Sequence, residues 1–188
     1  MNIEERRQAM IILCGPSASG KTEVAKHLGK AYDLKKVVTN TTRPMRVGEV
    51  DKIDYNFVSV EEFLKLKAED KFVETTFYNH NYYGCLKSQI GDDKIVVLEP
   101  EGVKNFLKLN DKKICVFYLN CNEEVRVARM RSRLDKEEDI RKRINNDLTS
   151  FDTKNLPQYN FVINTNYISI EEASEIIYNK YQEYLKTL

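Results

Sequence analysis

Residues 15 to 22 read Gly-Pro-Ser-Ala-Ser-Gly-Lys-Thr, which is a complete G-x-x-x-x-G-K-[ST] pattern. The apolar run at 10–14 before it predicts a buried strand, and residues 23–28 after it predict a helix. In this context the N–H groups of the loop and of the helix N-terminus converge on phosphate oxygens. The stretch therefore predicts a phosphate-binding loop in an α/β protein.

Two side chains of this loop predict specific chemistry. The Lys21 ammonium would reach the β- and γ-phosphates of a nucleotide such as ATP, and the Thr22 hydroxyl would ligate Mg²⁺. The alternative, a glycine turn with an exposed lysine, does not explain the buried strand and amphipathic helix on either side. The predicted nucleotide-binding residues of the loop are Gly15, Ser17, Ala18, Ser19, Gly20, Lys21 and Thr22.

The composition limits the classes of protein to which the chain can belong. Its 188 residues suit one domain, and 41% hydrophobic residues are enough for a buried core. A net charge of +1 provides no broad basic field, so we expect no nucleic-acid partner. Four cysteines without a C-x-x-C pair, and only two histidines, argue against a zinc site.

No apolar segment reaches the length of a membrane span or of a signal-peptide core. We therefore expect no membrane partner and a reduced, cytoplasmic location. The sequence leaves the oligomeric state open between a monomer and a homodimer.

Strand and helix patterns alternate along the chain, which predicts a P-loop three-layer sandwich around a parallel core sheet. Continuous apolar runs are typical of strands covered on both faces of such a sheet. Residues 1–8 predict a loose arm or the first turn of a helix. The five predicted core strands span 10–14, 36–39, 94–99, 114–119 and 161–164, and helices follow the loop and begin near 102, 123, 137 and 170.

The character of the sequence changes at 40–93, where short apolar runs alternate with polar residues. Strands at 54–58 and 72–77 predict a small mixed β insertion. The S-x-x-E patterns at 59–62 and 169–172 predict capping boxes at two helix starts. The predicted division is a core of residues 1–39 and 94–188 and an insertion of residues 40–93.

Two arginines in the insertion suggest a second phosphate site. Arg43 and Arg46 lie three residues apart, with Pro44 between them to constrain the backbone and Gly48 after them to free it. Guanidinium groups match phosphate oxygens bidentately and keep their charge. On these residues alone, a charged surface turn is an equally good interpretation.

Longer patterns resolve this ambiguity. The chain reads TTRPMRVGEVD at 41–51, DYNFVS at 54–59 and NYYG at 81–84, and its loop begins Gly-Pro-Ser. Together these segments closely resemble guanylate kinases, a family of P-loop nucleoside monophosphate kinases. The resemblance follows the family's order over nearly the whole chain.

The resemblance implies transfer of the ATP γ-phosphoryl group to GMP or dGMP, with Mg²⁺. It implies that Asn164 lies near the adenine of ATP, and that a lid at about 129–143 closes over the phosphates. The implied catalytic residues are Lys21, Arg43, Arg133 and Arg143. The implied GMP residues are Thr39, Arg43, Arg46, Tyr55, Glu74, Tyr83, Cys85 and Glu99.

Glu74 falls at the family position that accepts guanine N1–H and the 2-amino group. Adenine offers neither donor, so a buried Glu74 would stay unpaired against it, at a cost of roughly 1–3 kcal/mol. Taken without the resemblance, Glu74 is an ordinary exposed strand residue.

The chain also departs from the family pattern. Thr39 replaces a serine, Cys85 replaces a serine or threonine, and the usual Leu-Asp-x-Asp becomes Val97 and Glu99 at its two acidic positions. The segment at 85–94 is shorter than usual. These changes keep three alternatives open: a kinase with another acceptor, a catalytically silent module that binds phosphoproteins, and a nucleic-acid-binding role for the basic lid. Silent modules typically lose the loop lysine, which this chain keeps.

Overall fold

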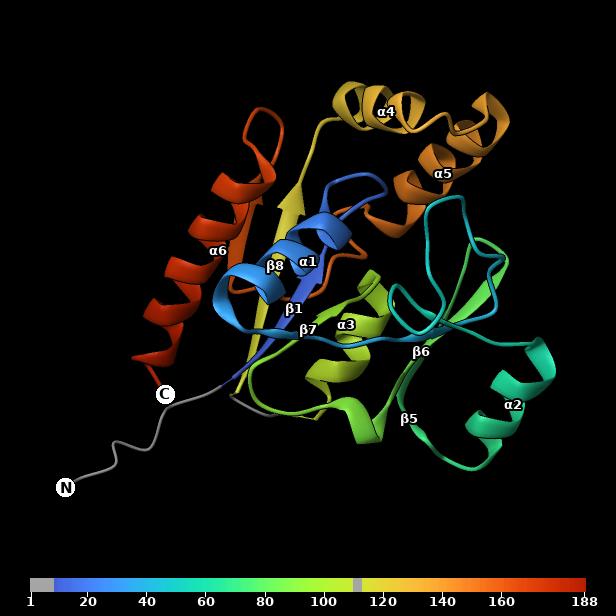
Figure 1. The fold of residues 1–188 in the computed structure, drawn as a ribbon, viewed down its shortest axis with the longest axis horizontal. Helices are drawn as coiled ribbons and strands as arrows, with labels where there is room; N and C mark the ends of the chain where they lie inside the picture. The colour runs from blue at the N-terminus through green and yellow to red at the C-terminus, as the bar shows by residue number, and fades with distance from the viewer. Residues whose placement is uncertain (1–8, 110–112) are drawn as a thin grey trace.

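The computed structural model describes residues 9–109 and 113–188, and the arm expected at 1–8 lies outside these ranges. Its core is a five-stranded sheet in which all neighbouring strands are parallel, which confirms the predicted core sheet (Figure 1). In spatial order the strands are β2 (Lys35–Lys36), β7 (Lys94–Val97), β1 (Met10–Cys14), β8 (Ile114–Asn120) and β9 (Phe161–Asn164).

The strand predicted at 36–39 is much shorter in the structure. The Val37 N–H still donates to the Ile95 carbonyl oxygen (2.7 Å), but the chain then leaves the core sheet. Residues 40–41 form β3 of a second sheet. Residues 37–41 are largely buried both before and after the point at which the chain changes sheet. The sequence therefore did not reveal this change.

Helices cover both faces of the core sheet and complete the three layers. Successive residues of β1 point to opposite faces. Ile11 packs in one cluster with residues of α1 and α6, and Ile12 packs in another with residues of α3. These helices are α1 (Lys21–Tyr32), α3 (Pro100–Leu107) and α6 (Ile170–Leu185). This packing fixes the carboxyl end of β1, from which the phosphate loop emerges.

The second sheet is mixed and has the strand order β4-β3-β6-β5. Asn79 and His80 both have positive φ at the turn between β5 and β6, as a two-residue type I′ hairpin requires. Phe63 of α2 stacks on Phe72 of β5 and covers one side of the sheet (4.6 Å between ring centroids). The elements are β3 (Asn40–Thr41), β4 (Asn56–Phe57), α2 (Val60–Ala68), β5 (Phe72–Tyr78), β6 (Asn81–Leu86) and a 3₁₀ turn η1 (Lys87–Gln89).

A helix pair forms the third part of the molecule, α4 (Glu123–Ser132) and α5 (Glu137–Ser150). The two helices share a small apolar cluster of Met130, Ile140 and Ile144, against which Ala18 of the phosphate loop also packs. In Figure 1 the pair lies at the top of the view, and α5 descends toward the β5–β6 hairpin.

The i, i+4, i+8 spacing of Ile140, Ile144 and Leu148 predicts that all three lie on the apolar face of α5, and this is wrong for Leu148. The Leu148 side chain is 62% exposed, whereas its neighbour Asp147 is 2% exposed. The helix therefore turns a carboxylate inward, three residues beyond Ile144, toward the phosphate loop.

Two of the predicted helix starts show the expected caps. Ser169 and Glu172 form a complete capping box at α6. At α2 the Ser59 hydroxyl accepts from the Glu62 N–H, which is half of the predicted box.

Candidate active site

The phosphate loop connects the end of β1 to the start of α1, as predicted. Glycine is needed at both ends, because a Cβ at Gly15 would lie 2.5 Å from the Leu119 carbonyl oxygen and Gly20 has a φ of 101°. The Lys21 ammonium donates to the carbonyl oxygens of Gly15 and Pro16, the second at 3.0 Å. The ammonium therefore lies against its own loop.

One cleft joins this loop to the second sheet and to α5. The space between its walls is about 990 Å³, which includes the part that is open to solvent. The predicted site residues that line it are Ser17, Ala18, Ser19, Gly20, Lys21, Thr22, Thr39, Arg43, Arg46, Tyr55, Glu74, Tyr83, Glu99, Arg133 and Arg143. Residues from four separate parts of the sequence thus face one cleft.

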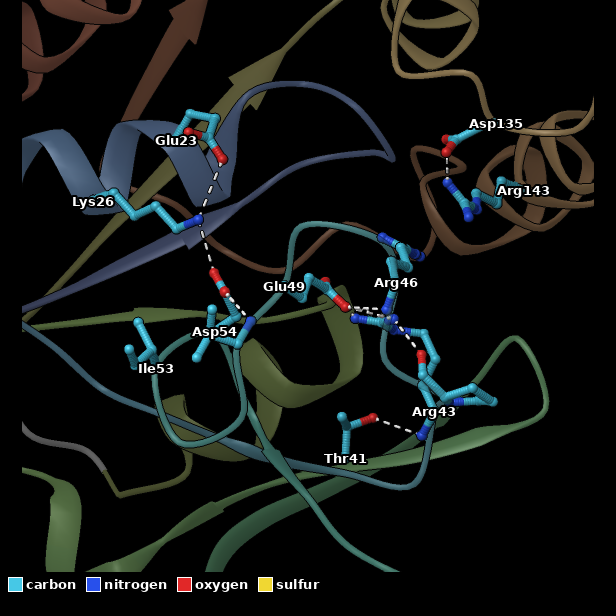
Figure 2. A network of polar contacts seen from close by, with 12 residues as sticks. Glu23, Lys26, Thr41, Arg43, Arg46, Glu49, Ile53, Asp54, Asp135 and Arg143 are labelled. Atoms are coloured by element: carbon cyan, nitrogen blue, oxygen red, sulfur yellow. Dashed lines mark hydrogen bonds and ion pairs between the residues drawn. The ribbon is translucent and has the colours of Figure 1, made fainter.

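Arg43 is held by a carboxylate that the sequence did not single out. Its guanidinium makes a two-point contact with Glu49 (3.0 and 2.8 Å) and also donates to the Pro44 carbonyl oxygen (2.7 Å), as Figure 2 shows. Burial alone would raise the pKa of Glu49, but hydrogen bonds from Arg43 and from the Arg46 N–H outweigh it, so the pKa is lowered. Glu49 therefore stays ionised and fixes the direction of the arginine.

Arg46 and two tyrosines complete a cationic cup around Arg43. The Tyr55 ring lies 5.4 Å from the Arg43 guanidinium and meets the Tyr83 ring edge to face, with 6.2 Å between centroids. Arg46 is exposed overall, but partial loss of water within the cleft, and then the nearby charges of Arg43 and Arg143, lower its pKa. Cations held this close favour an anion of high charge, such as a phosphate.

Glu74 lies deep in the same cleft and is 5% exposed. Burial raises its pKa to about 7, although hydrogen bonds from the Thr76 hydroxyl (3.2 Å) and the Cys85 N–H oppose the shift. Gly102 on α3 leaves room for the carboxylate, since a Cβ there would lie 3.0 Å from Glu74 Oε2. The ionised Glu74 carboxylate can accept more hydrogen bonds than Thr76 and Cys85 supply. It therefore suits a ligand that presents paired N–H groups.

Glu99 and Thr22 are the residues that fit a magnesium ion. Burial raises the pKa of Glu99 to about 7, and its Oε2 is buried without a hydrogen-bond partner. Among the described residues, no cluster of three His, Cys, Asp or Glu could form a protein-only metal site. Mg²⁺ usually retains water and shares one or two protein oxygens with nucleotide phosphates, and this donor set fits that pattern.

Two arginines of the predicted lid share one carboxylate. Asp135 accepts from Arg143 at 2.8 Å and lies 3.8 Å from Arg133, and all three residues belong to α5 or to the connection before it. Figure 2 shows Arg143 and Asp135 across the cleft from Arg46. Both arginines line the cleft while their charges are partly balanced by Asp135.

Comparison with known proteins agrees with this geometry. The sequence model of guanylate kinases matches residues 7–186. The chain belongs to the guanylate kinase family. Curated guanylate kinases from Mycoplasma mobile and Rickettsia prowazekii are 34% and 33% identical to it. Their alignments cover 93% and 82% of this chain and 94% and 81% of the relatives.

A solved structure shows the same fold. The guanylate kinase from Anaplasma phagocytophilum superposes with a TM-score of 0.70 at 21% identity, over 95% of this chain and 87% of its own. The three-layer core with a second mixed sheet is therefore an arrangement that this family member shares.

Three residues expected from the family pattern do not line the cleft. Gly15 acts through its backbone at the base of the loop. Cys85 is completely buried in the cluster beneath α3, where burial raises the pKa of its thiol to about 12. Asn164 ends β9, and its side chain accepts from the Asn166 N–H (3.0 Å). Val97, at the position of a family aspartate, does face the cleft.

Several polar residues of the site escaped the sequence patterns. Thr76 and Tyr78 line the cleft from β5, and Arg126 and Asp147 form a buried ion pair beside the loop (2.6 Å). A signal for Asp147 exists, because an acidic residue at spacing i+7 from Ile140 falls on the apolar face of the helix. Thr76 and Tyr78 alternate with exposed positions along β5, which marks the same face as Glu74.

Proposed function

We propose that this guanylate kinase family member transfers the γ-phosphoryl group of ATP to GMP or dGMP, giving ADP and GDP or dGDP. One observation carries the proposal: a single cleft contains both the phosphate loop with Lys21 and the cup of Arg43, Arg46, Tyr55 and Tyr83. Two phosphate sites that face each other are what transfer between two nucleotides requires.

In this proposal the acceptor is recognised at both ends. The cup holds the GMP phosphate through arginine and tyrosine donors, with Glu49 fixing Arg43. Glu74 accepts guanine N1–H and the 2-amino group, and Thr39 and Glu99 belong to the same side of the site. Adenine would leave the buried Glu74 carboxylate unpaired, which is the basis of discrimination.

The donor side is the phosphate loop. Lys21 neutralises the β- and γ-phosphates, and Arg133 and Arg143 leave Asp135 to balance the charge that develops on the transferring group. Thr22 would hold Mg²⁺, with Glu99 near it, and the ion would neutralise phosphate charge. We place Asn164 near the adenine on the family pattern, and the insertion at 40–93 and the lid at 129–143 are the parts proposed to close.

The test is an ADP-release assay with ATP, Mg²⁺ and a panel of GMP, dGMP, IMP, AMP, UMP and CMP. We expect turnover with GMP and dGMP, weaker turnover with IMP, which lacks the 2-amino group, and none with the others. Activity with a different acceptor would favour the alternative that Cys85 and Val97 have altered the acceptor site. No turnover with any acceptor would favour a phosphoprotein-binding module.

A variant separates catalysis from folding. Lys21→Ala should abolish transfer, with a loss of roughly 10³-fold or more, while circular dichroism and the melting temperature stay near wild type. Lys30→Ala, an exposed lysine on the same helix, is the matched control and should keep full activity. Full activity of Lys21→Ala would contradict the assignment of the phosphate loop.

We also propose a cytoplasmic location. No described helix is both long and apolar enough to cross a membrane. The four cysteines are free and buried, which suits a reducing compartment. A monomer and a homodimer remain the two predicted oligomeric states, which sedimentation velocity distinguishes.

A further inference from the structure

Asp147 on α5 is a buried carboxylate that the proposed transfer does not use. Its Oδ2 accepts from the Ser17 N–H (3.0 Å) and from Nη1 of Arg126 (2.6 Å). Its Oδ1 accepts from the hydroxyls of Ser17 (3.1 Å) and Tyr78 (2.7 Å). A buried carboxylate is tolerated where several donors replace its water, and here four do so.

These four donors come from three different parts of the cleft. Ser17 belongs to the phosphate loop, Tyr78 is the last residue of β5, and Arg126 belongs to α4. Ser17 and Tyr78 themselves line the cleft. Asp147 lies four residues after Arg143, which places both side chains on one face of α5. One carboxylate therefore connects the loop, the hairpin of the second sheet and the helix that bears a lid arginine.

The carbonyl side of the loop is held by α4 and by Thr165, the residue after β9. Arg126 Nη1 also lies 3.4 Å from the Ser17 carbonyl oxygen, and Arg129 Nη1 donates to the Ala18 carbonyl oxygen (3.2 Å). The Thr165 hydroxyl donates to the Ser19 carbonyl oxygen (2.9 Å). Three successive carbonyl groups of the loop are thus occupied, so α4, Thr165 and Asp147 of α5 together hold the loop conformation.

We propose that Asp147 is a positioning residue for phosphoryl transfer: it sets the phosphate loop, Arg143 and the β5–β6 hairpin at the spacing that in-line transfer needs. It acts on the donor side, so it supports kcat and ATP affinity and leaves GMP affinity unchanged. This inference rests on the proposed function, because it takes the loop as the ATP site and the cup as the GMP site. The competing interpretation is an ion pair that stabilises the fold and nothing more.

The main test variant removes both buried charges. Asp147→Ala alone would leave the Arg126 guanidinium without a counter-charge, so we combine it with Arg126→Met. We expect the double variant to melt within a few degrees of wild type. Its kcat should fall roughly 30- to 100-fold, as small misplacements of reacting groups do, and its Kd for a non-hydrolysable ATP analogue should rise roughly 5- to 10-fold. Its KM for GMP should stay within about two-fold of wild type.

A milder variant tests the same connection without removing a charge. Tyr78→Phe deletes one hydroxyl that bonds to Asp147, and we expect kcat to fall roughly 3- to 10-fold. In the background of the double variant the same change should have no further effect, because its partner is gone. Asn145→Ala, an exposed residue on the same helix beyond the lid, is the control and should behave as wild type.

Each outcome decides between the interpretations. A folded double variant with wild-type kcat and ATP affinity overturns the proposal. An equal loss of ATP and GMP affinity also overturns it, because this result would indicate a general loosening of the protein structure. Should the double variant not fold, the Tyr78→Phe kinetics decide alone. A wild-type protein that does not phosphorylate GMP contradicts the proposed function instead, and the ATP-analogue affinity of the double variant still tests the role of Asp147.

Discussion

At the scale of single residues, the most informative group is Glu74. Its pKa of about 7 arises from burial, which hydrogen bonds from Thr76 and from the Cys85 N–H only partly offset. A carboxylate with this pKa is roughly half protonated at neutral pH. Guanine donors require the ionised form, so GMP binding and the loss of this proton should be linked.

The sign of the pH effect follows. GMP affinity should increase as the pH rises through about 7, because ionised Glu74 is the form that accepts guanine N–H groups. We expect the KM for GMP to be roughly ten-fold higher at pH 6 than at pH 8. Glu74→Gln should raise KM roughly ten-fold or more and flatten this profile. Glu61→Gln, an exposed glutamate in the insertion, should change neither, and a flat wild-type profile would refute the linkage.

Thr76 tunes the same carboxylate. Its hydroxyl donates to Glu74 Oε2 and favours the ionised form. Thr76→Val keeps the shape but removes the donor, so the midpoint of the GMP profile should move to a higher pH. The measurement is KM for GMP from pH 6 to 9. Cys85→Ala keeps its backbone N–H and should leave the midpoint in place, and equal shifts in both variants would contradict the role of the hydroxyl.

At the scale of elements, the connection from α4 to α5 decides where the lid can move. Leu134 lies in this connection with a φ of 61° and is 90% exposed. Arg133 and Arg143 both lie near Asp135, so reaching the phosphates requires a change of partner. Beyond Arg143, the contacts of Asp147 tie α5 to the loop. We therefore expect closure to involve the connection and the first turns of α5.

Limited proteolysis tests this motion. Trypsin should cleave after Arg133 or Lys136 in the connection, and GMP together with a non-hydrolysable ATP analogue should slow this cleavage. Cleavage after Lys154, an exposed residue outside the lid, should proceed at an unchanged rate. Equal rates of lid cleavage with and without both nucleotides would contradict closure.

At the scale of the whole molecule, the cleft lies between parts that fold around different sheets. A ligand that contacts the loop, the cup and Glu74 at once links these parts, and its binding energy adds to the stability of the native state. In the proposed complex GMP contacts the cup and Glu74, whereas AMP offers the same phosphate without the guanine donors. The difference between the two ligands therefore isolates recognition of the base.

Thermal unfolding measures this difference. At a GMP concentration of about 100 times its Kd, native-state stability should increase by about 2.7 kcal/mol, which raises the melting temperature by roughly 5–10 °C for a chain of this size. AMP at the same concentration should produce a clearly smaller shift. Equal shifts would show that the phosphate alone is recognised and would contradict base reading by Glu74.

Much of this protein could be predicted from local patterns. The strand at 10–14 and the loop after it, the parallel core sheet and the capping box at Ser169 all depend on short-range periodicity or on backbone needs of a few neighbouring residues. The loop motif and the family pattern together selected most of the residues that line the cleft. The change of sheet after Val37 could not be predicted, because burial persists across it.

Spacing along the chain was enough to predict the phosphate loop, the order of the core strands and helices, and the family. Only the tertiary structure decided that Asp147 is buried beside Ser17, 130 residues away in sequence, and beside Tyr78, 69 residues away. It alone decided that Cys85 faces the core while Thr76 faces the cleft. Such partners depend on how α5 and β5 approach the loop, and burial of a polar group is stable only where that approach supplies its donors.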